Sequence, residues 1–204
     1  MNDGRFDIKN KLGQGSFGIT YLAYDNFLQK FVALKIVTLK TGVEEENAIN
    51  EIEALKYLSR ESNKYIVSYY DSFVETQNGE KKLIIVTEYI TGITLAVYIK
   101  NIVSLTVETL LSLMYGLVAG LKYIHHNNYA HGDIKLDNIM VTDKGEIKYI
   151  DFGLSCVKQC IRPNCTNLCS IKRSSVIHYA SPDYYRSNYR DVRISQSNDV
   201  WGWE

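Results

Sequence analysis

The feature that most constrains the fold is a change in the spacing of apolar residues less than halfway along the chain. Residues 1–90 contain short segments rich in β-branched and aromatic residues, which indicate strands, and one amphipathic helical segment. Residues 91–204 begin with apolar residues at helical spacing, most clearly over 106–126. We therefore expect an α+β fold in two parts, with the segment 91–94 connecting them.

The expected elements follow from local patterns. The predicted strands are 8–12, 19–24, 30–38, 66–73, 83–89, 139–142 and 147–150. The predicted helix 44–60 is acidic in its first turn and apolar at Ile49, Ile52, Leu55 and Leu58. The predicted helix 106–126 has an apolar face made of Leu110, Met114, Leu117, Val118, Leu121 and Ile124. The irregular stretch 154–178 is long enough to indicate a functional or mobile loop.

Composition and charge exclude several classes of protein. Of the 204 residues, 46% are hydrophobic, which is too apolar for a disordered chain. The 23 Lys and Arg residues balance 23 Asp and Glu residues without a polybasic run, which argues against a nucleic-acid binder or an anionic-membrane binder. We expect no membrane-spanning segment, and the first residues contain no secretory signal. These features predict a cytoplasmic, reducing location, where cysteines are thiols or metal ligands rather than disulfides.

A glycine-rich segment, GQGSFG at 13–18, has a spacing that can cradle phosphates. The same G-x-G-x-x-G pattern occurs in dinucleotide-binding folds, where the loop runs into a helix. Here the following residues, 19–24, indicate a strand, so we expect the loop at the tip of a hairpin. Glycines at that tip let backbone N–H groups approach phosphate oxygens. On the loop alone, an ordinary flexible hairpin is the alternative.

A lysine in an apolar strand, Lys35, requires an anionic partner if it points into the interior. Glu51 can supply the charge, because it lies within the inward stripe of the predicted helix. That stripe, at 3-4-3 spacing, consists of Ala48, Glu51, Leu55 and Leu58. We expect a Lys35–Glu51 ion pair that directs the ammonium towards nucleotide phosphates. The alternative is that both side chains extend into solvent.

The segment HGDIKLDN, which begins at His131, follows the long predicted helix and is the main candidate for catalysis. The next hairpin returns the chain to Asp151, and we expect Asn138 and Asp151 to lie opposite each other at its open end. Their oxygens are ligands that Mg²⁺ prefers. Asp133 can orient a substrate hydroxyl and accept its proton, while Lys135 can neutralise charge on a phosphoryl group. Unrelated carboxylates in a polar turn are the alternative.

Together these motifs resemble those of eukaryotic-type protein kinases. The resemblance covers almost the whole chain in the family's order: the glycine loop, VALK, Glu51, VTEYITG, HGDIKLDN, DFG, YASPD and DVW. It implies a two-lobed fold, with an antiparallel sheet and one helix in a small ATP-binding lobe (1–90) and a mostly helical large lobe (91–204). The Asp-x-Lys-x-x-Asn form further implies transfer of the ATP γ-phosphate to serine or threonine hydroxyls of protein substrates.

The resemblance also implies roles for single residues. The catalytic positions are Asp133, Lys135, Lys35 and Glu51. The ATP-binding positions are Gly13, Gln14, Gly15, Ser16, Phe17, Gly18, Thr20, Ala33, Lys35, Thr87, Glu88, Ile90 and Met140. Among these, Thr87 matches the gatekeeper, and Glu88 to Ile90 match the hinge. The magnesium ligands are Asn138 and Asp151, and His131 is expected to pack under Phe152 and near Asp199.

Some positions depart from the family pattern. Gly132 replaces the arginine of His-Arg-Asp, so we expect any activity to be independent of activation-loop phosphorylation. Val176 replaces a threonine usual in serine/threonine kinases, and Asp183 replaces the glutamate of the APE motif. The sequence stops at Glu204, so we expect an incomplete large lobe that is inactive alone or completed by a partner chain.

Four cysteines fall within the predicted irregular stretch, with C-x3-C-x4-C-x3-C spacing: Cys156, Cys160, Cys165 and Cys169. Four thiolates in so short a segment can close a tetrahedral Zn²⁺ site. The alternative is four reduced thiols without a metal.

The sequence therefore predicts a protein serine/threonine kinase that uses ATP and Mg²⁺, acts on protein substrates and does not bind nucleic acid. A catalytically silent, truncated kinase that binds nucleotide or acts as a scaffold is the alternative. A zinc-stapled interaction loop is a third hypothesis.

Overall fold

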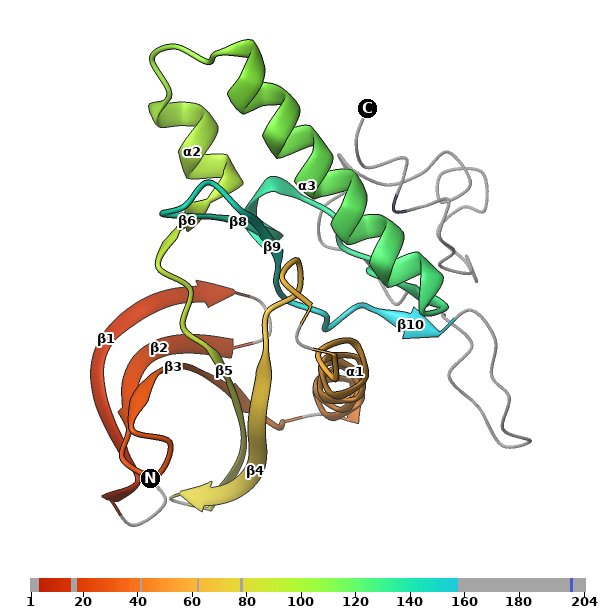
Figure 1. Cartoon of the computed structure of the whole chain (residues 1–204). Helices are drawn as coiled ribbons and strands as arrows, with labels where there is room; N and C mark the ends of the chain where they lie inside the picture. The colour runs from red at the N-terminus through yellow and green to blue at the C-terminus, as the bar shows by residue number, and fades with distance from the viewer. Residues whose placement is uncertain are drawn as a thin grey trace. The chain divides into compact units, whose positions relative to one another are not determined.

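The computed structural model describes residues 4–15, 18–40, 42–61, 63–77, 79–157 and 199. The chain divides into two compact units. The first comprises Met1–Asn63 and Val67–Thr91, and the second comprises Lys64–Ile66 and Gly92–Glu204. Figure 1 labels the helices and strands of both units. The expected α+β class is confirmed, since strands dominate the first unit and the longest helix lies in the second.

A five-stranded antiparallel sheet forms the first unit, in the order β1-β2-β3-β5-β4. Its strands are β1 Phe6–Gly15, β2 Gly18–Asp25, β3 Lys30–Thr38, β4 Tyr69–Gln77 and β5 Glu80–Glu88. All five predicted strands are present, but β4 begins three residues later than expected. Ile66, expected at its start, instead forms a parallel bridge to Tyr149 within the second unit.

The two faces of this sheet have different surroundings. Successive residues of a strand point to opposite faces. One face buries an apolar cluster of Phe6, Ala23, Val32, Leu34, Ile84 and Val86. The opposite face of β3 presents Ala33 and Lys35, so the alternation that builds the core also sets the direction of the candidate lysine.

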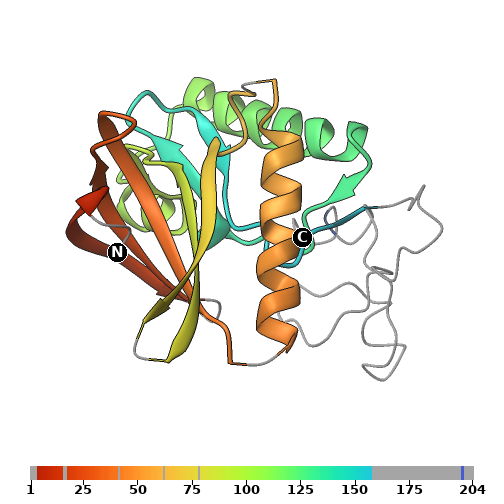
Figure 2. The ribbon, with the colours of Figure 1, turned by 90° about the horizontal axis from the view of Figure 1, so that it is seen from below.

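Helix α1, Gly42–Leu58, packs beside β3 and β4 of the same unit (Figure 2). Its buried residues include Ala48, Glu51, Leu55 and Leu58, which confirms the predicted 3-4-3 stripe. The prediction that Ile49 belongs to the apolar face is wrong, because Ile49 is 45% exposed. One residue corresponds to about 100° of rotation around a helix, so the inward position of Ala48 turns Ile49 away.

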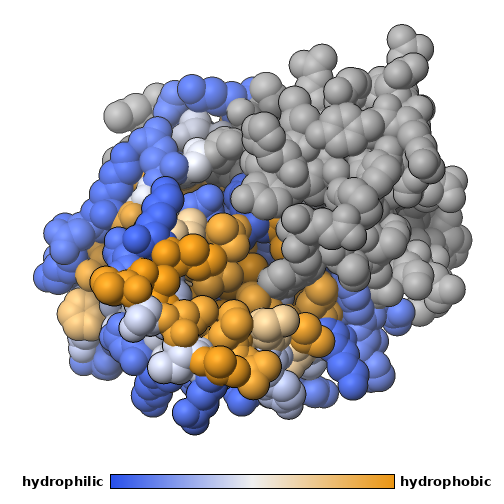
Figure 3. All heavy atoms as spheres, turned by 90° about the horizontal axis from the view of Figure 1, so that it is seen from above, coloured by the Kyte–Doolittle hydropathy of each residue, from blue (hydrophilic) through white to orange (hydrophobic). Residues whose placement is uncertain are grey.

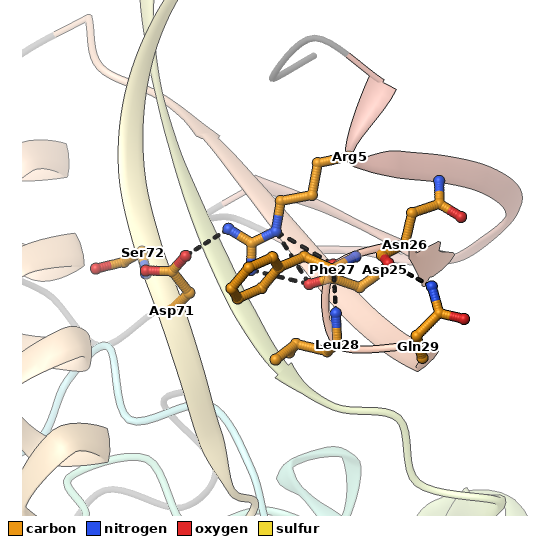
Figure 4. Close-up of polar contacts among 8 residues, drawn as sticks. All are labelled: Arg5, Asp25, Asn26, Phe27, Leu28, Gln29, Asp71 and Ser72. Atoms are coloured by element: carbon orange, nitrogen blue, oxygen red, sulfur yellow. Dashed lines mark hydrogen bonds and ion pairs between the residues drawn. The ribbon is translucent and has the colours of Figure 1, made fainter.

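An arginine at the start of the first unit, Arg5, ties three segments together, as Figure 4 shows. Its guanidinium donates to the fully buried carboxylate of Asp25 at 2.9–3.2 Å and to Asp71 at 2.6 Å. Asp25 also accepts bonds from the amides of Phe27 and Leu28 in the β2–β3 turn. Burial alone would raise the pKa of Asp25, but the bonds from Arg5 and these amides outweigh burial and hold the pKa below its usual value.

The second unit begins with a strand and a helix that the sequence did not predict. The segment expected as a simple connection contains β6, Gly92–Thr94, which leads into helix α2, Leu95–Asn101. The hydroxyl of Thr94 caps α2 by accepting a bond from the Val97 amide, which is the usual way to satisfy a helix N-terminus. The remaining described elements are α3 Val107–His126, β7 Tyr129–Ala130, the 3-10 turn Leu136–Asn138, β8 Ile139–Thr142, β9 Ile147–Tyr149 and β10 Cys156–Val157.

These strands form two small sheets. One has the order β6-β8-β9, and β10 pairs with β7 in the other. The two strands predicted between 139 and 150 are therefore present as β8 and β9.

Helix α3 packs against β9 of the same unit through two glycines. A Cβ atom added to Gly116 would lie 2.9 Å from the Ile147 side chain, and one added to Gly120 would lie 2.5 Å from the Tyr149 ring. The Tyr149 hydroxyl donates to the Leu117 carbonyl at 2.8 Å, which secures β9 against the helix. Burial also raises the pKa of Tyr149, with a further contribution from the charge of Asp199.

The predicted apolar face of α3 is therefore partly wrong. The buried residues are Leu113, Gly116, Leu117, Gly120, Leu121 and Ile124. Leu110, Met114 and Val118, which the sequence placed on the apolar face, are exposed, and Figure 3 shows apolar side chains gathered on the surface seen from above. By length and composition alone α3 is apolar enough to cross a membrane, a test that core helices of soluble proteins also pass.

Candidate active site

The glycine-rich segment lies at the tip of the β1–β2 hairpin, as expected from the strand that follows it. Gly15 pairs with Gly18, and Ser16 and Phe17 between them lie outside the described residues. Gly18 has a φ of 141°, and a Cβ atom there would lie 2.3 Å from the Ile36 carbonyl oxygen. The close approach of β3 therefore requires glycine at this end of the tip.

Four residues assigned to nucleotide binding share one face of the first unit's sheet. Thr20 pairs with Lys35 across β2 and β3, and Ala33 pairs with Thr87 across β3 and β5. Ala33 and Lys35 are two positions apart, so all four side chains lie on the same side. This is the face opposite the apolar cluster, and its small and polar residues leave it suited to a ligand.

The end of β5 carries the remaining candidates of the first unit. The Glu88 carboxylate accepts bonds from the amide and hydroxyl of Ser68, both at 3.2 Å, while its own amide donates to the Ser68 carbonyl. Ile90 is buried two residues later. Met140, the last adenine-binding candidate, lies in β8 of the second unit opposite Lys148.

The expected ion pair of the first unit is present. The Lys35 ammonium lies 2.8 and 2.7 Å from the two carboxylate oxygens of Glu51. The side chains are only 15% and 5% exposed, so the alternative in which both extend into solvent is wrong. A largely desolvated carboxylate at this position keeps the ammonium in place on the ligand-facing side of β3.

The candidate catalytic carboxylate, Asp133, is held by two side chains of its own loop. Its Oδ2 atom accepts a bond from the Lys135 ammonium at 2.6 Å and from the Asn138 amide nitrogen at 2.8 Å. The same nitrogen donates to the Asp133 carbonyl at 3.0 Å. The loop therefore brings together three of the predicted functional side chains.

The backbone of this loop is bound by Asp199. Its buried carboxylate accepts bonds from the amides of His131 and Gly132, at 2.7 and 2.8 Å, and contacts His125 Nε2 at 2.9 Å. The His131 ring lies 4.7 Å from the ring of Phe152, centroid to centroid. These contacts place His131 as the sequence predicted, packed by Phe152 and tied to Asp199.

The predicted pairing of Asn138 with Asp151 is wrong by one residue. The carbonyl of Asn138 accepts a bond from the amide of Ile150, at 2.9 Å. The turn between β8 and β9 sets this register, because Thr142 pairs with Glu146 around three residues, whereas the predicted strands left four residues in the turn. Asp151 follows immediately, at a φ of 60°, and its Oδ1 accepts a 3.4 Å bond from the Gly153 amide.

The donor set of this hairpin end nevertheless fits a magnesium ion. The bonds to Asp133 engage only the nitrogen of the Asn138 amide, so its oxygen can act as a hard ligand. Asp151 adds carboxylate oxygens one residue beyond the position that pairs with Asn138. Within the described residues no group of three or more acidic, histidine or cysteine side chains could hold a metal.

The cysteine prediction falls almost entirely outside the described residues. Only Cys156 is described, as the first residue of β10 opposite Ala130. Cys160, Cys165 and Cys169 lie beyond the described range, as do Val176 and Asp183.

Comparison with known proteins identifies a family and relatives that the chain resembles. A family model described as protein kinase domain matches residues 6–203. The chain is 32% identical over 153 residues to the serine/threonine-protein kinase dst4 of Dictyostelium discoideum, a match that covers 74% of this chain and 30% of that protein. It is 28% identical over 198 residues to mitogen-activated protein kinase kinase 2 of Arabidopsis thaliana, covering 96% of this chain and 50% of that protein.

A bacterial protein is similar to the same extent. The serine/threonine-protein kinase PrkC of Bacillus subtilis is 32% identical over 185 residues, which is 90% of this chain and 27% of that protein. The chain thus spans half or less of the length of these relatives.

Proposed function

Because the chain belongs to the protein kinase domain family, we propose that it transfers the γ-phosphate of ATP to serine or threonine hydroxyls of protein substrates. The observation that carries the proposal is the loop in which Lys135 and Asn138 both donate to the carboxylate of Asp133. These are the three side chains that phosphoryl transfer needs close to the acceptor. The names of the relatives support serine and threonine as acceptors.

Asp133 has the chemistry of the proton acceptor. Its carboxylate is oriented by two donors, so it can fix a substrate hydroxyl and accept the proton as the new bond to phosphorus forms. Lys135 contributes a positive charge at the same point, which stabilises the negative charge that develops on the transferred group.

The other candidates bind and orient the nucleotide. Lys35, held by Glu51, contacts phosphate oxygens, and the glycines of the β1–β2 tip offer backbone amides to them. Asn138 and Asp151 supply the oxygens that would hold Mg²⁺. When bound, the ion neutralises phosphate charge and orients the phosphate chain.

The test is Asp133→Asn in the full chain, assayed with radiolabelled ATP and a generic protein substrate. We expect transfer to fall by about 10²–10⁴-fold, the usual contribution of a general base, while nucleotide binding is kept. Asp137→Asn is the matched control, because Asp137 is an exposed carboxylate in the same loop. Equal transfer by the wild type and Asp133→Asn would contradict the proposal. Nucleotide binding by a wild-type chain without transfer would favour the silent, scaffold-like alternative.

A further inference from the structure

Large apolar side chains form a stripe on the solvent side of helix α3. Each member is between 43% and 73% exposed, and spacings of three or four residues place them along one face of the helix. The apolar stripe consists of Val107, Leu110, Leu111, Met114, Tyr115 and Val118. A contiguous exposed patch of this kind indicates an interaction surface.

Two exposed charges of opposite sign flank the apolar stripe. Glu108 lies in the first turn of α3 and Lys122 lies near its end, each seven residues from Tyr115. Seven residues complete two helical turns to within about 20°, so these three side chains lie in one row along one edge of the stripe. Between the two charges, Ser112 is the one exposed residue of α3 that is polar.

This arrangement is complementary to its own reverse. A two-fold axis at Tyr115, perpendicular to the helix, sets two copies of α3 antiparallel and brings the same edge of each stripe together. Glu108 of each copy then faces the partner's Lys122, and the two Tyr115 rings meet near the axis. A parallel pair would bring opposite edges together and would not match the two charges.

We propose that the apolar stripe of α3 binds a second copy of this chain, in an antiparallel pair with two equivalent contacts between Glu108 and Lys122. The stripe extends over about 17 Å of helix, so the interface is small and we expect a dissociation constant on the order of 10 µM. The inference does not depend on the proposed function, because it uses none of the candidate catalytic or nucleotide-binding residues.

A lipid surface fits this helix less well, although α3 is apolar enough to cross a membrane by length and composition. Gly116 and Gly120 are in close contact with β9, so lipid cannot surround the helix. A helix that lies on a bilayer surface typically carries several basic residues on its polar face, whereas α3 contains a single Lys and no Arg.

Self-association is measured by analytical ultracentrifugation of the full chain, at concentrations about tenfold below and above the expected dissociation constant. We expect a reversible dimer in the wild type. Tyr115→Glu should raise the dissociation constant by at least about a hundredfold, because it places two like charges at the axis. Val74→Glu is the matched control and should dimerise as the wild type does, since Val74 is an apolar residue of β4 in the first unit that is 58% exposed.

Charge reversal tests the antiparallel arrangement. Glu108→Lys and Lys122→Glu should each weaken self-association by about tenfold, because each brings like charges together at both ends of the pair. An equimolar mixture of the two variants should associate about as tightly as the wild type, since every lysine then faces a glutamate. A segment of the same chain covering the stripe could not produce recovery on mixing.

Three results would overturn the inference. The first is a wild type that stays monomeric at every concentration. The second is a dimer that Tyr115→Glu does not weaken, which would place the interface elsewhere. The third is a pair of charge-reversal variants that do not recover on mixing.

Vesicle flotation separates the lipid alternative from the dimer. Vesicles of phosphatidylcholine and phosphatidylserine are mixed with the wild type and with Tyr115→Glu. We expect neither protein to float with them. Flotation of the wild type that is lost in Tyr115→Glu would assign the apolar stripe to a membrane surface and would contradict the proposal.

Discussion

Two buried carboxylates among the described residues of the first unit, Asp25 and Glu51, meet cations, and they differ in how the charges are held. Asp25 is fully buried and receives the planar fork of Arg5 together with two turn amides. Glu51 is buried to a similar degree but meets the compact ammonium of Lys35 from the neighbouring strand. One carboxylate is surrounded by the backbone it organises, whereas the other holds the flexible side chain of Lys35.

The comparison separates a structural pair from a functional one. A guanidinium offers several donors in a fixed plane, so Arg5 can join the chain start, the β2–β3 turn and β4 in one geometry. An ammonium is a point charge with rotatable donors, which suits contact with a mobile phosphate chain. We therefore expect changes at Asp25 to affect stability and changes at Lys35 to affect phosphoryl transfer.

The largest expected effect is that of Lys35→Arg. The substitution keeps a positive charge opposite Glu51, so the free energy of unfolding should change less than it does when one partner of a buried ion pair is removed. Phosphoryl transfer should fall by on the order of 10²–10³-fold, because the larger planar group cannot reproduce the position of the ammonium. Chemical denaturation and a transfer assay on the same preparation measure both quantities. Unchanged phosphoryl transfer would contradict the functional role assigned to the Lys35–Glu51 pair.

Asp25→Asn should have the opposite profile. Removing one partner of a buried ion pair typically lowers the free energy of unfolding by about 3 kcal/mol, while kcat per folded molecule should stay unchanged. Urea unfolding at neutral pH measures the loss. A variant with unchanged stability and reduced kcat would instead show that Asp25 has a functional role rather than a structural one.

The pH dependence of the unfolding free energy provides a control for the Asp25→Asn experiment. The pKa of Asp25 is lower in the folded chain than its usual value, so the folded state favours the ionised form. The resulting stabilisation is fully present above the unfolded pKa of about 3.9 and disappears as the pH falls through the folded pKa. The difference in stability between the wild type and Asp25→Asn should therefore narrow below about pH 4.

The smallest expected effect is that of Asp71→Asn. Asp71 also accepts a bond from Arg5, but its side chain is 42% exposed. Solvent screens such a pair, and the loss in unfolding free energy should be below about 1 kcal/mol. Thermal unfolding beside Asp25→Asn measures the ratio of the two effects. A loss as large as that of Asp25→Asn would show that exposure does not distinguish the two carboxylates.

The same contrast explains what the sequence could predict. Lys35 and Glu51 could be paired in advance because each lies in a regular element whose period sets its direction. The Arg5–Asp25–Asp71 cluster follows no such period, since its members come from the start of the chain, the end of β2 and the distant strand β4. Only the tertiary arrangement of the sheet brings them together.

Two errors had local causes. The face of α3 was misplaced because glycines carry its contact with β9, and a pattern that counts large apolar residues overlooks them. The Asn138 register was wrong by one residue because it depends on the length of the β8–β9 turn, which apolar alternation does not encode. The sequence could group the three side chains of the catalytic loop because they lie within six residues of one another.

The close approach of α3 to β9 restricts which substitutions the helix can accept. Any side chain larger than hydrogen at Gly116 or Gly120 meets Ile147 or Tyr149, and a displaced β9 would carry Asp151, two residues later, along with it. We therefore expect substitutions to be tolerated on the solvent-exposed side of the helix but not at these two glycines. Selection for activity from a library of α3 variants would then act on the position of Asp151, about thirty residues downstream, as well as on folding.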